Sequence, residues 1–161
     1  MKSGLIIRKY NGQYLQDLRE IFFLNIPHYF YAEEWCGFYG FLHSDLNDNS
    51  VYDVCVFNNQ VVGSGGIVLQ NEKTVVFTRG MIHASHHKTG FCKHVLDHRL
   101  ALACEMFPTK QIELSTTKHS FGFFEKYKFV TIERQNDFWS KGLDLCKMIL
   151  PKKLILHRRD R

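Results

Sequence analysis

Three β-rich segments in succession, followed by a helix that begins after a glycine, constrain the fold of this chain more than any other feature. The segments are residues 52–57, 61–69 and 74–82, and short turn sequences separate them. After Gly90, apolar residues recur at helical spacing until Pro108, before which a helix normally ends. The sequence therefore predicts an antiparallel three-stranded meander that leads into a strand–loop–helix junction.

Strand and helix patterns alternate on both sides of this unit, without internal repeats or a linker. Further strands are predicted at residues 5–8, 111–115, 129–134 and 143–150. Helices are predicted between Asn11 and Ile26, at residues 32–42 and at residues 120–126. Together these elements predict an α/β fold in which a mixed sheet carries helices on its faces.

The composition is typical of one globular domain. With 161 residues, of which 45% are hydrophobic and 14% aromatic, the chain can bury one core and is not a disordered protein. Because the sequence has no run of about 18 apolar residues, we expect no membrane span, no secretory signal and a cytoplasmic location. The five cysteines are an odd number without a CxxC pair, so we expect neither a disulfide framework nor a zinc ribbon.

The positive charge of the chain is concentrated at its C-terminus. Residues 151–161 hold five basic residues and one acidic residue, so they carry +4 of the net charge of +5, and residues 1–150 carry +1. A basic tail could touch RNA, an acidic partner or a membrane surface, but a solvated tail is the simpler interpretation. We therefore divide the chain into one domain, residues 1–150, and a basic tail, residues 151–161, and expect no nucleic-acid or membrane partner.

Residues 83–98 contain five of the nine histidines, which raises the question of a metal site. His94 and His98 are four residues apart and would share one face of a helix, a spacing that zinc can use. The segment lacks an HExxH motif and a second ligand cluster, so we predict no metal. A glycine-containing loop that enters a helix is instead suited to an anion, and Lys88 and Lys93 add positive charge. The alternative is that the loop is a plain connection.

Two motifs between residues 80 and 129 resemble those of the GCN5-related N-acetyltransferase family. The family's loop signature is Gln or Arg, two residues, Gly, one residue, then Gly or Ala. It falls on residues 87–92, HKTGFC, where Gly90 alone matches strictly. The later signature, aromatic-Tyr-Glu-Lys-x-Gly-Phe, falls on residues 123–129, FFEKYKF, with two differences. The order of elements is similar over nearly the whole chain, which implies a mostly antiparallel sheet of six to seven strands with helices on both faces.

The resemblance also implies an activity. It implies an N-acetyltransferase that moves an acetyl group from the cosubstrate acetyl-CoA to a primary amine, by direct attack in a ternary complex. The acceptor is a small-molecule amine or a peptide amine. The alternative is a non-catalytic protein of the same fold that binds acyl-CoA as a sensor or scaffold. Some family members dimerise through the last strand, so residues 143–150 are a candidate contact for a homodimer.

The resemblance assigns the donor site to the backbone of the third meander strand and of the following loop, with one hydroxyl from a later loop. These cofactor-binding candidates are Met81, Ile82, His83, His87, Lys88, Thr89, Gly90, Phe91, Cys92, Lys93 and Thr117. The acceptor site of the family includes the connection between the first two helices, where Tyr29, Tyr31 and Glu33 are the candidates here. Aromatic rings and a carboxylate suit a cationic amine; the alternative is that the rings belong to the core and the glutamate is solvated.

The catalytic assignments follow from the same resemblance. Many family members use a tyrosine as general acid at the position of Phe124, which has no proton to give. The thiolate of coenzyme A can instead leave as such or take a proton from water, since an ordinary thiol has a pKa of about 8.5. Glu113 is the candidate general base, and His119 and His83 are further candidates because histidine is neutral near pH 7.

Overall fold

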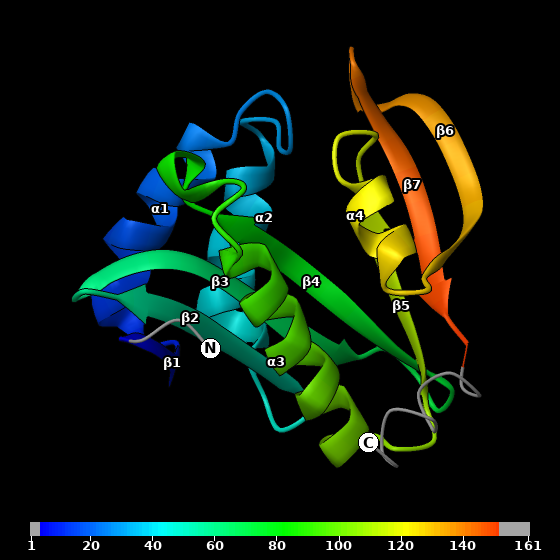
Figure 1. The fold of residues 1–161 in the computed structure, drawn as a ribbon, viewed down its shortest axis with the longest axis horizontal. Helices are drawn as coiled ribbons and strands as arrows, with labels where there is room; N and C mark the ends of the chain where they lie inside the picture. Colours follow the sequence, from blue (N-terminus) through cyan, green and yellow to red (C-terminus); the bar gives the residue numbers. More distant parts are fainter. Residues whose placement is uncertain (1–3, 152–161) are drawn as a thin grey trace.

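A computed structural model describes residues 4–151 as one seven-stranded sheet with helices on both faces (Figure 1). The strands are β1 (Leu5–Lys9), β2 (Ser50–Phe57), β3 (Gln60–Leu69), β4 (Thr74–Ile82), β5 (Gln111–Thr116), β6 (Val130–Ser140) and β7 (Leu143–Leu150). The helices are α1 (Leu15–Leu24), α2 (Glu34–Gly40), α3 (Phe91–Met106) and α4 (Phe121–Lys126). A π-helical turn, Phe41–Asp45, continues α2.

The strand order is β1-β2-β3-β4-β5-β7-β6, and every neighbouring pair is antiparallel except β4 and β5. The predicted mixed, mostly antiparallel sheet and its meander are therefore confirmed. The parallel pair is short, because it joins only Thr74–Phe77 to Gln111–Leu114. Beyond this pairing β4 runs on to Ile82 and β5 to Thr116, and Figure 1 shows the two strands diverging.

Each face of the sheet has its own apolar core, which is why helices cover both faces. On one face α1 and α2 pack against β2 and β4 through large buried side chains, among them Leu18, Phe22, Phe38, Tyr52 and Met81. On the other face α3 packs against β3, β4 and β5, with Leu96, Leu100, Ile67, Phe77 and Leu114 in the core. The side chains of α4 pack against this second core. Helices on both faces are thus confirmed.

One expectation about the C-terminal strands needs correction. The strand predicted at residues 129–134 begins at Val130 and continues to Ser140, where a turn with Gly142 at φ +79° leads into β7. β7 lies between β5 and β6, and its pairing with β5 covers residues 146–150. A homodimer through residues 143–150 stays a prediction.

Some sequence expectations fall partly outside residues 4–151. The basic residues of the tail, 152–161, are not among the residues that the structure describes. Within the described part of the chain, no helix is long and apolar enough to cross a membrane.

Candidate active site

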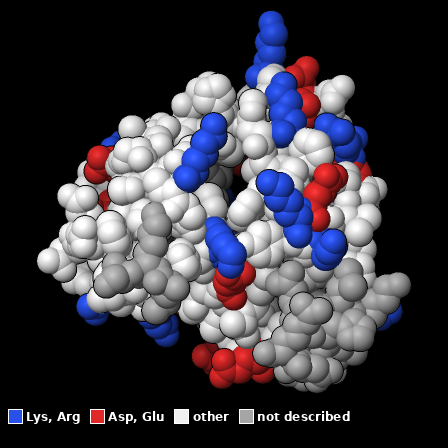
Figure 2. Space-filling view, in the orientation of Figure 1, with Lys and Arg blue, Asp and Glu red and all other residues white. Residues whose placement is uncertain are grey.

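A cavity of about 540 Å³ lies where β4 and β5 diverge. Its walls come from the connection between α1 and α2, from β4, from the first half of α3, from the loop after β5 and from the end of β6. Figure 2 shows a hollow near the centre of the molecule with Lys and Arg side chains around it. The cavity thus brings together segments that are far apart in the sequence.

One wall of the cavity is the beginning of α3. Gly90 precedes the helix with φ +91°, a conformation that side chains with a Cβ rarely adopt, and it gives the helix no side-chain cap of its own. The first backbone N–H groups of a helix have no partner within it, so the start of α3 is a place where a helix can bind an anion. Lys88 and Lys93 line the same wall. The result is a positively polarised site for an anion.

His87 has a positioning role in this loop. Its Nε2 atom lies 3.0 Å from the backbone oxygen of Ile82, and because a carbonyl oxygen only accepts, this nitrogen carries the proton. The buried side chain of Asn25 donates to the same oxygen at 2.9 Å. The ring of His87 also meets the ring of Tyr29 edge to face, with 5.4 Å between centroids. His87 therefore ties the loop to β4 and to the connection between α1 and α2.

The opposite wall is rich in aromatic rings and holds one carboxylate. Tyr29 lies between His87 and His119, with 6.0 Å between its centroid and that of His119, and Trp139 from β6 also lines the cavity. The Glu34 carboxylate accepts a hydrogen bond from the backbone N–H of Tyr31 at 3.3 Å. Burial raises the pKa of Glu34, an effect that this hydrogen bond and the charge of Arg79 partly offset. An acidic group in an aromatic pocket is suited to bind an amine.

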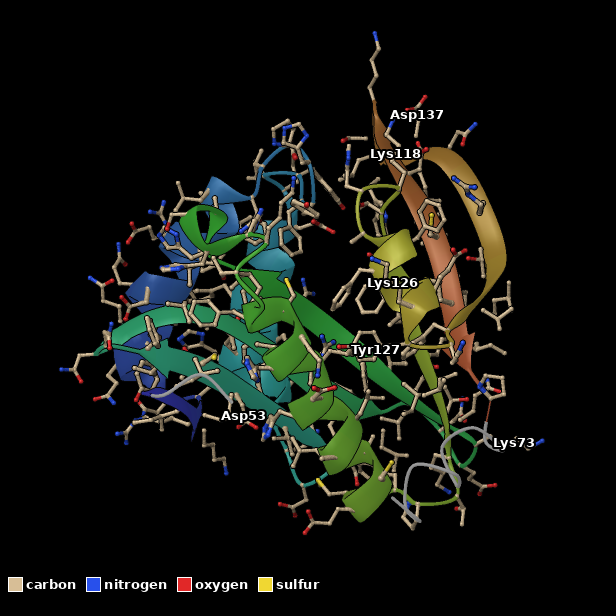
Figure 3. All side chains as sticks on the ribbon, viewed as in Figure 1. Asp53, Lys73, Lys118, Lys126, Tyr127 and Asp137 are labelled. Carbon is tan, nitrogen blue, oxygen red and sulfur yellow. The ribbon has the colours of Figure 1, made fainter. Side chains whose placement is uncertain are left out.

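The five histidines of residues 83–98 do not converge on one point. His98 pairs with Asp53 of β2 at 2.6 Å, and Figure 3 shows Asp53 beside α3. His87 faces Ile82, and His83 forms a 2.8 Å hydrogen bond with the hydroxyl of Ser85. Among the described residues no group of three or more His, Cys, Asp or Glu side chains is arranged to hold a metal ion.

No protein-family model and no curated protein matches the sequence, but solved structures match over almost its full length. One is spermidine N-acetyltransferase from Vibrio cholerae in complex with CoA and spermine, with a TM-score of 0.66 and 17% identity over 96% of this chain and 99% of that chain. Another, from Desulfovibrio desulfuricans, is described as a putative acetyltransferase of the GNAT family, with a TM-score of 0.73 and 12% identity over 92% of this chain and 99% of that chain. A third is an aminoglycoside 6'-N-acetyltransferase complexed with coenzyme A, with a TM-score of 0.67 and 12% identity over 91% of this chain and 97% of that chain. This chain has the GCN5-related N-acetyltransferase fold.

Within this acetyltransferase fold, most of the predicted donor-site residues and one of the three predicted acceptor-site residues meet at the cavity. The predicted residues that line it are Tyr29, Met81, Ile82, His87, Lys88, Gly90, Cys92, Lys93, Thr117 and His119. The predicted residues outside the lining are Tyr31, Glu33, His83, Thr89, Phe91 and Glu113. For the loop this matters little, because its predicted role belongs to the backbone.

The two carboxylates predicted for the site do not lie in the cavity. Glu113 pairs with Lys147 of β7 at 3.4 Å, and Glu33 is exposed at the start of α2. Glu34, one residue further on, lines the cavity instead. The placement of Glu113 gives no support to its predicted role as a base, and Glu34 is the carboxylate that sequence reasoning missed. Tyr31 contributes indirectly, because its ring stacks on that of Trp139 with 6.4 Å between centroids.

Two arginines flank the point in the acetyltransferase fold where β4 leaves β5. Arg79 has φ +49°, and its guanidinium lies over the ring of Phe38, 5.3 Å from the centroid, on the side of α2. Arg99 reaches the cavity from α3 and is only 6% exposed. Burial lowers the pKa of Arg79 and lowers that of Arg99 to about 10. Phe124, at the position of the family's usual tyrosine, also lines the cavity.

Proposed function

We propose that this protein is an N-acetyltransferase that transfers the acetyl group of acetyl-CoA to the primary amine of an acceptor. The observation that carries the proposal is the layout of the cavity. One end is the start of α3 after Gly90, which suits an anion, and the other end holds Glu34 among aromatic rings, which suits a cation. A negatively charged donor and a positively charged acceptor would therefore meet between them, beside β4.

The donor would bind along α3 and β4. The pyrophosphate would accept hydrogen bonds from the backbone N–H groups that follow Gly90, with the charges of Lys88 and Lys93 close by. The pantetheine arm contains amide groups, and the part of β4 from Thr78 to Ile82 has left its pairing with β5. Backbone groups of this part, such as those of Met81, are suited to bind the amides as a strand would. The carbonyl of Ile82 is less suited because Asn25 and His87 already donate to it.

The acceptor would bind between Glu34, Tyr29 and Trp139 as an ammonium ion. Attack on the thioester needs the neutral amine, so a proton must leave the nitrogen. A carboxylate with a raised pKa is a stronger base than an ordinary glutamate, and Glu34 has this property because of its burial. We therefore assign to Glu34 the removal of this proton, directly or through water. His119 lines the cavity and is the second candidate for this removal of the proton. Its ring centroid lies 5.3 Å from that of His28.

The reaction then balances as a direct transfer. The neutral amine nitrogen attacks the carbonyl carbon of the thioester, the C–S bond breaks, and its electron pair goes to the sulfur. The products are the N-acetylated acceptor, the thiolate of coenzyme A and two protons, one that left the ammonium ion before the attack and one that the nitrogen loses as the amide forms. Positioning both substrates in one cavity supplies much of the rate enhancement, because the thioester is already activated.

Release of free thiol from acetyl-CoA in the presence of amines tests the proposal. The panel would contain spermidine, an aminoglycoside, free amino acids and a lysine-containing peptide, because structures similar to this chain are named for the first two substrate classes. The expected result is saturable thiol release with at least one amine, greatly reduced in Glu34→Gln. Saturable binding of acetyl-CoA without thiol release for any amine would instead support the non-catalytic sensor or scaffold, as the phenylalanine at position 124 would suggest.

A further inference from the structure

The guanidinium of Arg99 is a buried charge in the cavity wall without an acidic partner. Arg99 is 6% exposed, and within residues 4–151 no carboxylate pairs with it. Its Nε atom donates to the backbone oxygen of Gly66 at 3.3 Å, and its Cζ atom lies 4.6 Å from the centroid of the Phe77 ring. Neither contact neutralises the charge, and an isolated buried charge is costly.

The sheet has made room for this side chain. A Cβ atom on Gly80 would overlap Nη1 of Arg99, and one on Gly65 would lie 2.9 Å from its Cδ. The guanidinium therefore rests directly on β4 at Gly80, next to Arg79, where β4 has left β5. Since Gly80 and Arg99 both line the cavity, the charge faces the space that the donor would occupy.

The length of the donor places its sulfur at this level. The part of α3 from Phe91 to Arg99 rises about 12 Å, at about 1.5 Å for each residue. The pantetheine arm has about as many chain atoms as four residues of polypeptide and spans roughly 13 Å when extended. With the pyrophosphate at the start of α3, the sulfur would lie close to the guanidinium of Arg99.

We propose that Arg99 stabilises the thiolate that leaves when the thioester breaks. Phe124 has no proton to give, so the electron pair of the C–S bond stays on sulfur as a negative charge. A guanidinium that is charged near neutral pH and has free N–H groups offsets this charge without a proton transfer. The thiolate then takes a proton from water after it leaves the cavity. This role rests on the proposed acetyl transfer and adds to it the group that receives the developing charge.

Titration of the bound coenzyme A thiol tests this role directly. The thiolate absorbs in the ultraviolet, and the complex with desulfo-CoA, which lacks the sulfur, supplies the baseline that removes the signal of the protein's own cysteines. Because an opposite charge within about 4–6 Å lowers a pKa by about 1–3 units, the thiol bound to the wild type is expected to ionise at least about one pH unit below free coenzyme A. In Arg99→Met the bound thiol is expected to have a pKa equal to or above that of the thiol of free coenzyme A. In Arg99→Lys its pKa is expected to lie between the values in the wild type and in Arg99→Met.

Binding and turnover separate this role from a structural one. Arg99→Met is expected to bind desulfo-CoA as the wild type does. Above the pKa of the bound thiol it is expected to bind coenzyme A about tenfold more weakly than the wild type. In turnover, its kcat is expected to fall while the KM for acetyl-CoA changes little. Arg19→Met is the matched control, since Arg19 also lies over a phenylalanine ring, 5.0 Å from the centroid of Phe23, but is exposed on α1. It should behave as the wild type in all three assays.

Two results would overturn the role of Arg99. An unchanged thiol titration in Arg99→Met would show that the guanidinium does not interact with the sulfur. An equal loss of coenzyme A and desulfo-CoA binding would show that Arg99 only maintains the shape of the cavity. If the wild type binds neither compound, the proposed function itself is wrong, a result that is distinct from either of the first two.

Discussion

Replacement of Arg99 by methionine is expected to increase the stability of the folded protein by about 2 kcal/mol. Burial lowers the pKa of this guanidinium to about 10, about 2.5 below the ordinary value for arginine. At about 1.4 kcal/mol for each pKa unit, burying the charge costs the folded state about 3 kcal/mol. Loss of the hydrogen bond to Gly66 would remove about 1 kcal/mol of stabilisation. Methionine fills a similar elongated space without a charge.

The sign of the pH dependence follows from the same pKa. Because the folded value lies below the unfolded value, the cost of the charge is fully present below about pH 10 and diminishes only as the pH rises above it. The stability difference between the wild type and Arg99→Met should therefore be constant from about pH 6 to about pH 9. A residue that raises activity while lowering stability is expected at a functional site.

Urea unfolding followed by circular dichroism would measure this difference. The expected result is a higher midpoint for Arg99→Met with an unchanged slope, so that the gain belongs to the folded state. Arg19→Met, which removes an exposed charge, should change the free energy of unfolding by less than about 0.5 kcal/mol. A loss of 1 kcal/mol or more in Arg99→Met would refute the reasoning, because it would mean that the guanidinium holds the fold together.

Three further predictions concern the two ends of the cavity. Glu34→Gln should lower kcat at least about tenfold. The wild-type rate should rise with pH through the raised pKa of Glu34 and then level off. Stopped-flow or steady-state pH profiles of the variant should not show this rise. Gly90→Val should weaken acetyl-CoA binding about tenfold, because a left-handed backbone conformation costs a residue with a side chain about 1–2 kcal/mol. Calorimetry would measure this change. The control variant Gly12→Val, which lies outside the cavity, should bind acetyl-CoA normally. Trp139→Ala should raise the KM for the amine more than the KM for acetyl-CoA, and an equal rise in both would place the acceptor elsewhere.

Much of the fold could be predicted because its strands and helices are patterned by a buried face. β3 contains six consecutive buried residues, and the buried residues of α3 recur at helical spacing. β6 was predicted too short for the opposite reason. β6 is an edge strand of the sheet, and its side chains are mostly exposed. Asp137 interrupts it with φ +53°. A strand with little to bury has no apolar alternation to read, so the sequence did not reveal Trp139 as a cavity residue.

The site was predictable where it depends on the backbone and less so where it depends on one side chain. The loop at Gly90 could be predicted because a glycine-containing loop that enters a helix is suited to an anion. Glu33 was chosen in place of Glu34 because the start of a short helix cannot be fixed to one residue from a pattern, and one residue turns a side chain from solvent to the cavity. Arg99 did leave a signal, because it occupies the apolar stripe of α3 between Leu96 and Ala103.

Calorimetric titration of the purified protein with acetyl-CoA tests most directly whether the cavity is a donor site. We expect saturable one-to-one binding that saturating coenzyme A abolishes by competition, since both compounds carry the pyrophosphate and the pantetheine arm. A folded protein that gives no binding heat at two temperatures, and whose thermal unfolding acetyl-CoA does not shift, would contradict it.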